Sequence, residues 1–444
     1  MRPILRCIFP LLAVAGWVAL AEADATEPEA ALAAHPVTTE QAVLQAVWLN
    51  HPSSQALELR VKAAQTAAMR NAGLPEPRLD ASAMEIDLPP SKQPRISLTI
   101  SQPFPLGHQD QAMVHAGRVA AQAIAAQHPN LQAETEFSAR MAFIAWREVA
   151  ARKQVLAHHA HMGDQLLELA QRSVANGRAG QQSRLWRMQA NVAELNANLE
   201  ALQTLEPALQ ASVQALMGQA TQTELPAPDL RLPEGPLEVN PANLLTDHPT
   251  LARRNLQAEA AKAQAKAESA ANAGVLMPGV GVMSMADMPF GLVLMVGATL
   301  PGWGASKERA AARAGMGVHQ ALALEAETQA WSRGWLAQMH EVSGRLRSLT
   351  ARRDRLANTV MPLLRKAAQA DTPGLVTGNT TVFDIYEALH QQVQLELNLV
   401  DLDTAWLQAR AQYLRLERGD GSGAMATGPS LSLPASSATG GMGM

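Results

Sequence analysis

The sequence predicts an α+β membrane protein in which one unit, a pair of short strands followed by a pair of long helices, occurs twice. Three observations predict this fold class. Residues 107–176 and 305–370 are long stretches of helical character, and the first contains a single proline, Pro129. Residues 95–102 alternate apolar and small polar side chains, as a strand with two different faces does. The order of elements also repeats at an offset of about 197 residues, from about Thr38 to Leu416.

The first repeat is predicted over residues 38–220 and the second over residues 239–418, with a proline-rich linker, 221–238, between them. Asp247-His248-Pro249 in the second repeat matches Asn50-His51-Pro52 in the first. In the first repeat we expect helices, strands and long helices at about 38–50, 53–72, 79–87, 95–102, 107–176 and 181–217. In the second we expect strands at 280–287 and 290–300 and long helices at 305–370 and 379–417. This repeated order predicts an internal duplication.

Both ends of the chain differ in composition from the repeats. Residues 1–23 have the features of a secretory signal peptide: Arg2 and Arg6, an apolar run, and a small-residue cleavage site. Residues 24–37 are expected to be a linker, and the Gly-, Ser- and Met-rich residues 419–444 a disordered tail. The only cysteine, Cys7, lies within the signal peptide, so no disulfide is expected in the mature chain.

Composition and motifs argue against two functional classes. The formal net charge of −4 gives no reason to expect nucleic acid as a partner. No Gly-x-Ser-x-Gly motif or phosphate-binding glycine loop is present. His340-Glu341 begins a zinc-protease pattern, but Gly344 occupies the place of the second histidine. We therefore expect neither an enzyme nor a cofactor.

The predicted elements cannot be stable in a single chain. A helix of about 70 residues extends roughly 100 Å and needs neighbours to bury its apolar seam. Strands of about 8 to 11 residues are long enough to cross a bilayer when tilted, but four strands cannot close a barrel. Three chains would supply about twelve strands, within the range of bacterial barrels. The sequence therefore predicts a homotrimer with a shared barrel in contact with lipid.

A glycine-to-alanine pattern marks the turn of each predicted helical hairpin. In the second hairpin it runs from Gly378 to Ala388 and contains Asp384 and Glu387, which share one face of a helix near its beginning. The first hairpin has Gly180 and Ala190 at the same spacing, with Trp186 where the acidic residue would stand.

This pattern, found twice within a duplicated chain, resembles the hairpin tips of the TolC family of outer-membrane efflux channels. The resemblance implies a trimer with a twelve-stranded outer-membrane β-barrel, four strands per chain, continued by a long α-helical barrel in the periplasm of a Gram-negative bacterium. It also implies a passive exit duct that works with a periplasmic adaptor protein and an inner-membrane RND pump. The adaptor would dock at the hairpin tips around the two glycines and two alanines, and Asp384 and Glu387 would line the pore constriction.

Histidine and methionine side chains, which are soft or borderline metal ligands, suggest which substance is exported. His158, His161 and Met162 share one face of the first long helix, and Met283 and Met285 lie in the second strand pair. Methionine in a strand can instead be lipid-facing, and histidines on a long helix can simply be solvated. With these residues as candidate metal ligands, the sequence favours a heavy-metal exporter of the CusC or CzcC type.

Other functions remain open. The chain could be an exit duct for drugs or for type I protein secretion. In a different class, it could be a periplasmic coiled-coil adaptor or scaffold, although an adaptor would be expected to have one hairpin rather than two.

Overall fold

A computed structural model describes the chain at residues 39–69, 73–84, 95–175, 181–219, 225–233, 241–270, 273–285, 288–299, 306–367 and 381–421. The predicted signal peptide, N-terminal linker and most of the tail lie outside these residues, as do the tip glycines Gly180 and Gly378. The chain forms two compact units. One contains Met1–His51, Ser138–Glu234 and Ser348–Gln408; the other contains Pro52–Phe137, Gly235–Arg347 and Ala409–Met444.

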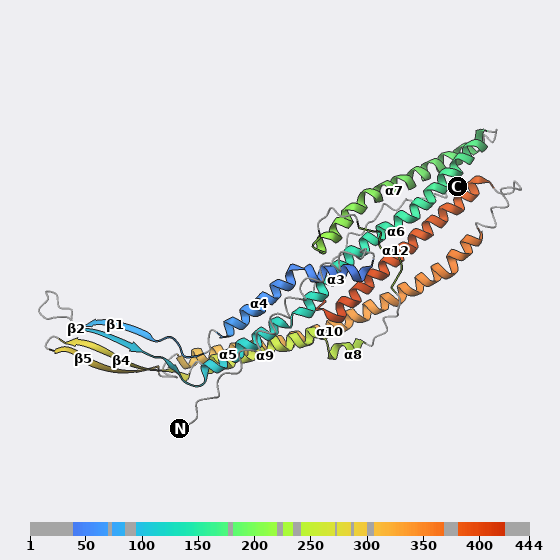
Figure 1. Ribbon diagram of the computed structural model, residues 1–444. Coiled ribbons are helices and arrows are strands. Elements are labelled where there is room, and N and C mark those ends of the chain that lie inside the picture. The colour runs from blue at the N-terminus through green and yellow to red at the C-terminus, as the bar shows by residue number, and fades with distance from the viewer. Residues whose placement is uncertain are drawn as a thin grey trace, which may run out of the picture. The chain divides into compact units, whose positions relative to one another are not determined.

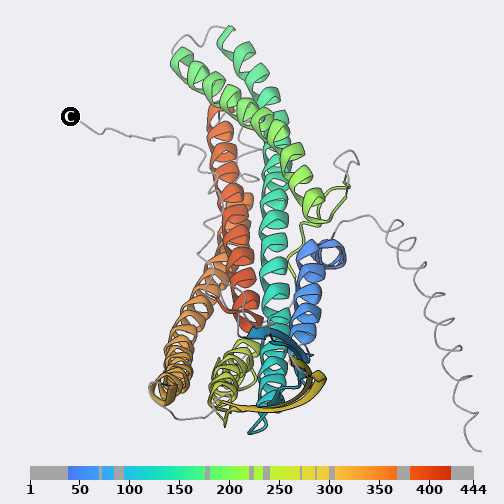
Figure 2. The same ribbon diagram turned by 90° about the vertical axis from the view of Figure 1, so that its left-hand side faces the viewer.

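The first unit is a bundle of long helices. Its elements are α3 (Glu40–Asn50), most of α6 (His128–Ala175), α7 (Gln182–Leu216), the end of α10 (Ser306–Arg355), a π-helix (Leu356–Val360), and most of α12 (Val382–Arg418). α6, α7 and α12 run alongside one another in both views (Figures 1 and 2). Three apolar clusters hold this bundle together.

These clusters follow one another along the bundle. In the first, α3 packs on α6 and α7, with Trp146 and Val213 fully buried. In the second, Val149 and Leu156 of α6 meet Val393 of α12. The third lies near the beginnings of α7 and α12 and joins Ala170, Leu185, Met188, Val192, Phe383 and Tyr386. The helix seams expected from the sequence therefore form within one chain, between α6, α7 and α12.

The second unit contains an antiparallel sheet. Its strands are β1 (Arg78–Met84), β2 (Arg95–Ser101), β3 (Phe104–Pro105), β4 (Val275–Met285) and β5 (Met288–Ala298). β1 pairs with β2, β2 and β3 pair with successive parts of β4, and β4 pairs with β5 (Figure 1). The sheet thus brings together the strand pairs of the two predicted repeats, with β2 directly beside β4.

Helices accompany the sheet in this unit: α4 (Pro52–Met69), α5 (Gln109–Ala125), α9 (Pro249–Ala270) with the short α8 (Pro241–Thr246) before it, and the part of α10 up to Arg347. α5 packs against both α4 and α9. A Cβ on Gly117 of α5 would lie 2.5 Å from the Cβ of Ala68 in α4, and a Cβ on Gly317 of α10 would lie 2.6 Å from that of Ala265 in α9. At each of these contacts the two helices lie so close together that a side chain in place of the glycine would clash.

Prolines change both long helices that the sequence predicted as continuous. The helix predicted over 107–176 is two helices, because α5 ends at Ala125 and α6 begins at His128. Pro129 has no N–H, and its ring would clash with the carbonyl of Ala125, four residues earlier. In the helix predicted over 305–370, the π-helix at Leu356–Val360 ends two residues before Pro362, and the chain is helical again over 361–367. A π-turn is a known way for a helix to accommodate an interrupted hydrogen-bond ladder.

The second strand pair also differs from its predicted bounds. β4 begins at Val275, five residues before the predicted start, and passes through Pro278. Pro278 lies where its partner changes from β2 to β3, and its carbonyl accepts a hydrogen bond from the N–H of Gln102 at 3.0 Å. The local break in the neighbouring strand lets a proline lie inside the sheet.

Three pairs of equivalent elements begin at the same spacing, although β2 and β5 begin 193 residues apart and α7 and α12 begin 200 residues apart. α4 and α9 begin at Pro52 and Pro249, β1 and β4 at Arg78 and Val275, and α5 and α10 at Gln109 and Ser306. Each of these pairs is separated by 197 residues. Among the described helices, none combines the length and apolar character needed to cross a membrane.

Candidate functional site

The beginning of α12 fixes the orientation of Asp384. The N–H and the hydroxyl of Thr381 donate to Oδ2 of Asp384 at 3.0 and 2.6 Å, and the N–H of Asp384 donates to the Thr381 hydroxyl at 3.3 Å. This reciprocal arrangement is a capping box, which satisfies N–H groups that have no partner inside the helix. Asp384 therefore starts the helix as well as carrying charge, and Glu387 is exposed one turn further along.

Asp384 has a cationic neighbour that the sequence pattern did not reveal. A guanidinium nitrogen of Arg184, in the first turn of α7, lies 3.8 Å from Oδ1 of Asp384, and both side chains are about half exposed. The Thr381 hydroxyl, the Thr381 N–H and the charge of Arg184 hold the pKa of Asp384 below its usual value. No spacing rule connects positions 184 and 384, because their proximity depends on the packing of the two hairpins.

The third apolar cluster holds these hairpin ends in place. Leu185, beside Arg184, is buried against a group that includes Phe383, beside Asp384. Tyr386 is buried in the same cluster, and burial raises its pKa to about 12. Trp186 faces outward with 62% of its surface exposed. Of the predicted docking residues, Ala190 is exposed and Ala388 is half-buried.

The candidate metal ligands occupy both units. His158 and His161 are exposed on α6, and Nε2 of His161 lies 3.1 Å from the side-chain nitrogen of Gln165. Met162 is half-buried, while Met283 and Met285 belong to β4 of the other unit. Within the part of the chain that the structure describes, no three His, Cys, Asp or Glu side chains converge as a metal site.

His159, which the sequence analysis did not select as a candidate ligand, has a different environment. Its side chain is fully buried, and its Nε2 lies 2.8 Å from Oε2 of Glu396 on α12. Gln392 donates to the other oxygen of Glu396 at 2.9 Å. The hydrogen bond between His159 and Glu396 connects α6 to α12, and it is the principal reason that the pKa of Glu396 lies below its usual value.

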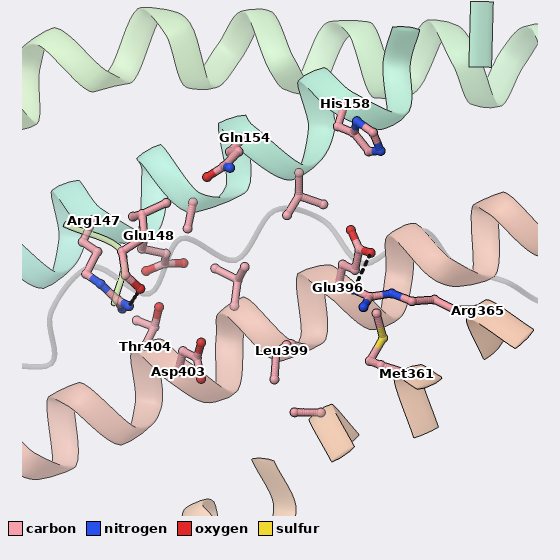
Figure 3. Close-up of a pocket in the computed structure, with 15 residues that line it drawn as sticks. Arg147, Glu148, Gln154, His158, Met361, Arg365, Glu396, Leu399, Asp403 and Thr404 are labelled. Atoms are coloured by element: carbon pink, nitrogen blue, oxygen red, sulfur yellow. Dashed lines mark hydrogen bonds and ion pairs between the residues drawn. The ribbon is translucent and has the colours of Figure 1, made fainter. Parts of the chain in front are cut away.

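A cavity of about 490 Å³ lies between α6, α12 and the segment that follows the π-helix. At one end, Arg147 points toward Thr404 and Asp403; at the other, His158, Glu396 and Arg365 lie near one another (Figure 3). The carboxylates are already bound: Arg353 contacts Asp403 at 2.7 Å, and Glu396 has the partners described above. The carboxylates of Asp403 and Glu396 that line the cavity are therefore already paired within the protein.

The sheet has two faces of different chemistry. Alternate residues in register across the strands place large apolar side chains on one face, and most of them are exposed: Leu79, Ile96, Leu98, Ile100, Val280, Val282, Leu292 and Leu294. The opposite face carries many small or polar residues, including Ser97 and Thr99, together with the apolar Met283, Val293 and Met295. On this face Gly281 lies directly against the backbone of Leu98. A contiguous exposed apolar face of this kind indicates an interaction surface for a membrane or for another protein.

Comparisons with known proteins identify the fold. No family model matches the sequence, and no curated protein matches it. Solved structures do match: one of CusC aligns with a TM-score of 0.71 and 12% identity, covering 86% of this chain and 93% of that chain. VceC from Vibrio cholerae aligns at 0.67 and 16% identity over 86% of this chain and 96% of its own.

The open state of the MtrE outer-membrane channel of Neisseria gonorrhoeae aligns at 0.68 and 16% identity, covering 86% of this chain and 89% of that chain. Alignments that cover most of both chains at such low identity establish a common fold. The resemblance predicted from the hairpin tips is confirmed at this level. The chain therefore has the fold of TolC-family outer-membrane channels.

Proposed function

We propose that this protein is the outer-membrane channel of a tripartite RND-type efflux system, a passive conduit that extends into the periplasm. The observation that carries this proposal is the exposed apolar face of the sheet. In a soluble protein such a face would be buried, whereas a bacterial barrel presents apolar side chains to lipid and polar ones to its lumen.

The strand order supports a trimer. Each chain contributes β1, β2, β4 and β5 side by side, with β1 and β5 at the two edges. Open edges are not tolerated in lipid, because unpaired N–H and C=O groups have no water there. Pairing β5 of one chain with β1 of the next would close a barrel of about twelve strands from three chains.

An internal duplication is proposed for the same chain. The common spacing of three pairs of elements supports it, and so does the contact of Gly117 with Ala68 in one half and of Gly317 with Ala265 in the other. Both glycines lie near the start of the long helical segment, and both alanines lie near the end of the helix before the strands.

The direct test is to purify the protein and to record its conductance in planar lipid bilayers. The mature protein extracted from membranes should require detergent, run as a trimer, and form conducting pores in planar lipid bilayers. A water-soluble monomer without conductance would refute the channel and would favour the periplasmic adaptor or scaffold. The adaptor and pump of the complete system would then be sought by reconstitution with candidate partners.

Asp384 and Glu387 are proposed as the acidic residues of the pore constriction. Both are exposed on one face of α12, next to the proposed adaptor-docking end of the hairpins. A ring of carboxylates at a constriction attracts cations and repels anions. Replacing both with their amides, Asp384→Asn and Glu387→Gln, should lower the ratio of cation to anion permeability without preventing trimer formation.

The proposed cargo is a heavy-metal cation such as copper or silver. The histidines and methionines of the candidate ligand group support this choice, because imidazole and thioether groups suit these ions. A deletion strain should become sensitive to copper or silver salts. Sensitivity to antibiotics alone, with unchanged metal tolerance, would favour the drug-exporting alternative, and a defect in protein export would favour type I secretion.

A further inference from the structure

We propose that Arg184 sets the ion selectivity of the constriction by offsetting the charge of Asp384. This inference rests on the proposed channel function and concerns the same acidic residues. The guanidinium of Arg184 lies 3.8 Å from Oδ1 of Asp384, and the two residues belong to different hairpins. Because a cation lies beside this carboxylate, the net negative charge at the proposed constriction is smaller than the two acidic residues alone would give.

An apolar contact between α7 and α12 holds the two helices that carry Arg184 and Asp384. Leu185 and Phe383, their immediate neighbours in sequence, are buried in one apolar cluster, so the beginnings of α7 and α12 are fixed against each other. Thr381 binds Oδ2 of Asp384, which leaves Oδ1 directed toward Arg184. Because this carboxylate is held at one oxygen, it has little freedom to turn away from the guanidinium.

The charges can be counted for one chain. Asp384 and Glu387 contribute two negative charges and Arg184 one positive charge, so their net charge is −1. The Debye length at physiological ionic strength is about 8 Å, which exceeds the separation of Arg184 and Asp384. A permeating ion therefore responds to the sum of these charges rather than to the carboxylates alone.

This count gives an ordered prediction for charge-neutralising variants. Arg184→Gln changes the net charge per chain to −2 and should raise the cation-to-anion permeability ratio by about twofold or more. Asp384→Asn changes it to 0 and should lower the ratio by a similar factor. The double variant returns the charge to −1 and should restore a ratio near that of the wild type.

The measurement is the reversal potential of the purified trimer in planar bilayers under a potassium chloride gradient. Arg187→Gln is the matched control, because Arg187 is an exposed arginine on the same turn of α7 and has no ion pair within the described residues. Because Arg187 does not pair with Asp384, this variant should raise the ratio less than Arg184→Gln does. Each variant is first checked as a trimer, since a loss of assembly would be detected there.

The outcomes separate this inference from the proposed function. If Asp384→Asn changes the ratio and Arg184→Gln does not, the role of Arg184 is wrong while the acidic constriction stands. If Arg187→Gln acts as strongly as Arg184→Gln, the effect is one of general surface charge and the inference is also wrong. If no variant changes the ratio, the constriction itself is wrongly placed.

Discussion

Replacing Gly317 by alanine tests the close helix contact between α10 and α9. The new Cβ would lie 2.6 Å from the Cβ and 3.2 Å from the Cα of Ala265, so one helix must move. Overpacking of this kind costs about 1–3 kcal/mol. A Cβ added at Gly315, on the same helix, would meet no neighbouring atom within 4 Å, so Gly315→Ala is the control.

Both substitutions change the helix propensity equally, a gain of roughly 0.5–1 kcal/mol, so this contribution cancels between them. The difference between the two variants should therefore be about 1–3 kcal/mol, with Gly317→Ala the less stable. The assay is denaturant unfolding in detergent, followed by far-ultraviolet circular dichroism. Equal unfolding midpoints for the two variants would refute the close contact.

Three further predictions concern other parts of the chain. Burial lowers the pKa of His248 in the native state below its usual value of 6.5. As pH falls below 6.5, the histidine therefore becomes protonated in the unfolded state before it does in the native state. The wild type should therefore lose stability as pH falls from about 7 through 6.5 and below, and His248→Gln should lose less, as measured by thermal unfolding at each pH. Leu294→Lys, on the apolar face of the sheet, should reduce the trimer recovered from outer membranes at a cost of about 2–4 kcal/mol, whereas Val293→Lys on the other face should have a smaller effect; equal losses would contradict the assignment of the faces. Thr381→Ala should destabilise the start of α12 by about 1 kcal/mol, seen as faster amide hydrogen exchange in its first turn, and unchanged exchange would exclude the capping box.

Periodic features of this chain could be predicted from its sequence, and features that depend on single residues or on packing could not. Alternation in residues 95–102 correctly predicted β2, and the repeat offset agrees with the starts of three pairs of elements. The division of the first long helix was missed although Pro129 was noticed, because the rest of the run, on both sides of this proline, has helical character. Pro129 lies far from the predicted start at residue 107, at a distance where a proline breaks a helix, and in the structure it lies in the first turn of a second helix.

The candidate site was predictable only in part, for a related reason. Asp384 and Glu387 could be found because their spacing is local and belongs to a pattern. Arg184 could not, since it lies 200 positions away and approaches Asp384 only through the packing of α7 against α12. His159 was similarly hidden, because nothing in His158-His159 shows which ring faces Glu396 and which faces solvent.

The reciprocal hydrogen bonds between Thr381 and Asp384 give the Asp384 side chain two roles, capping the helix and carrying charge. Replacement by alanine would remove both roles at once. Alanine at position 384 would remove the acceptor for the Thr381 N–H together with the charge, so a changed current could reflect a frayed helix end. Asparagine keeps an acceptor oxygen and removes only the charge. The charge of the proposed constriction can thus be changed independently of the helix end only by substitutions at position 384 that preserve the shape of the carboxylate.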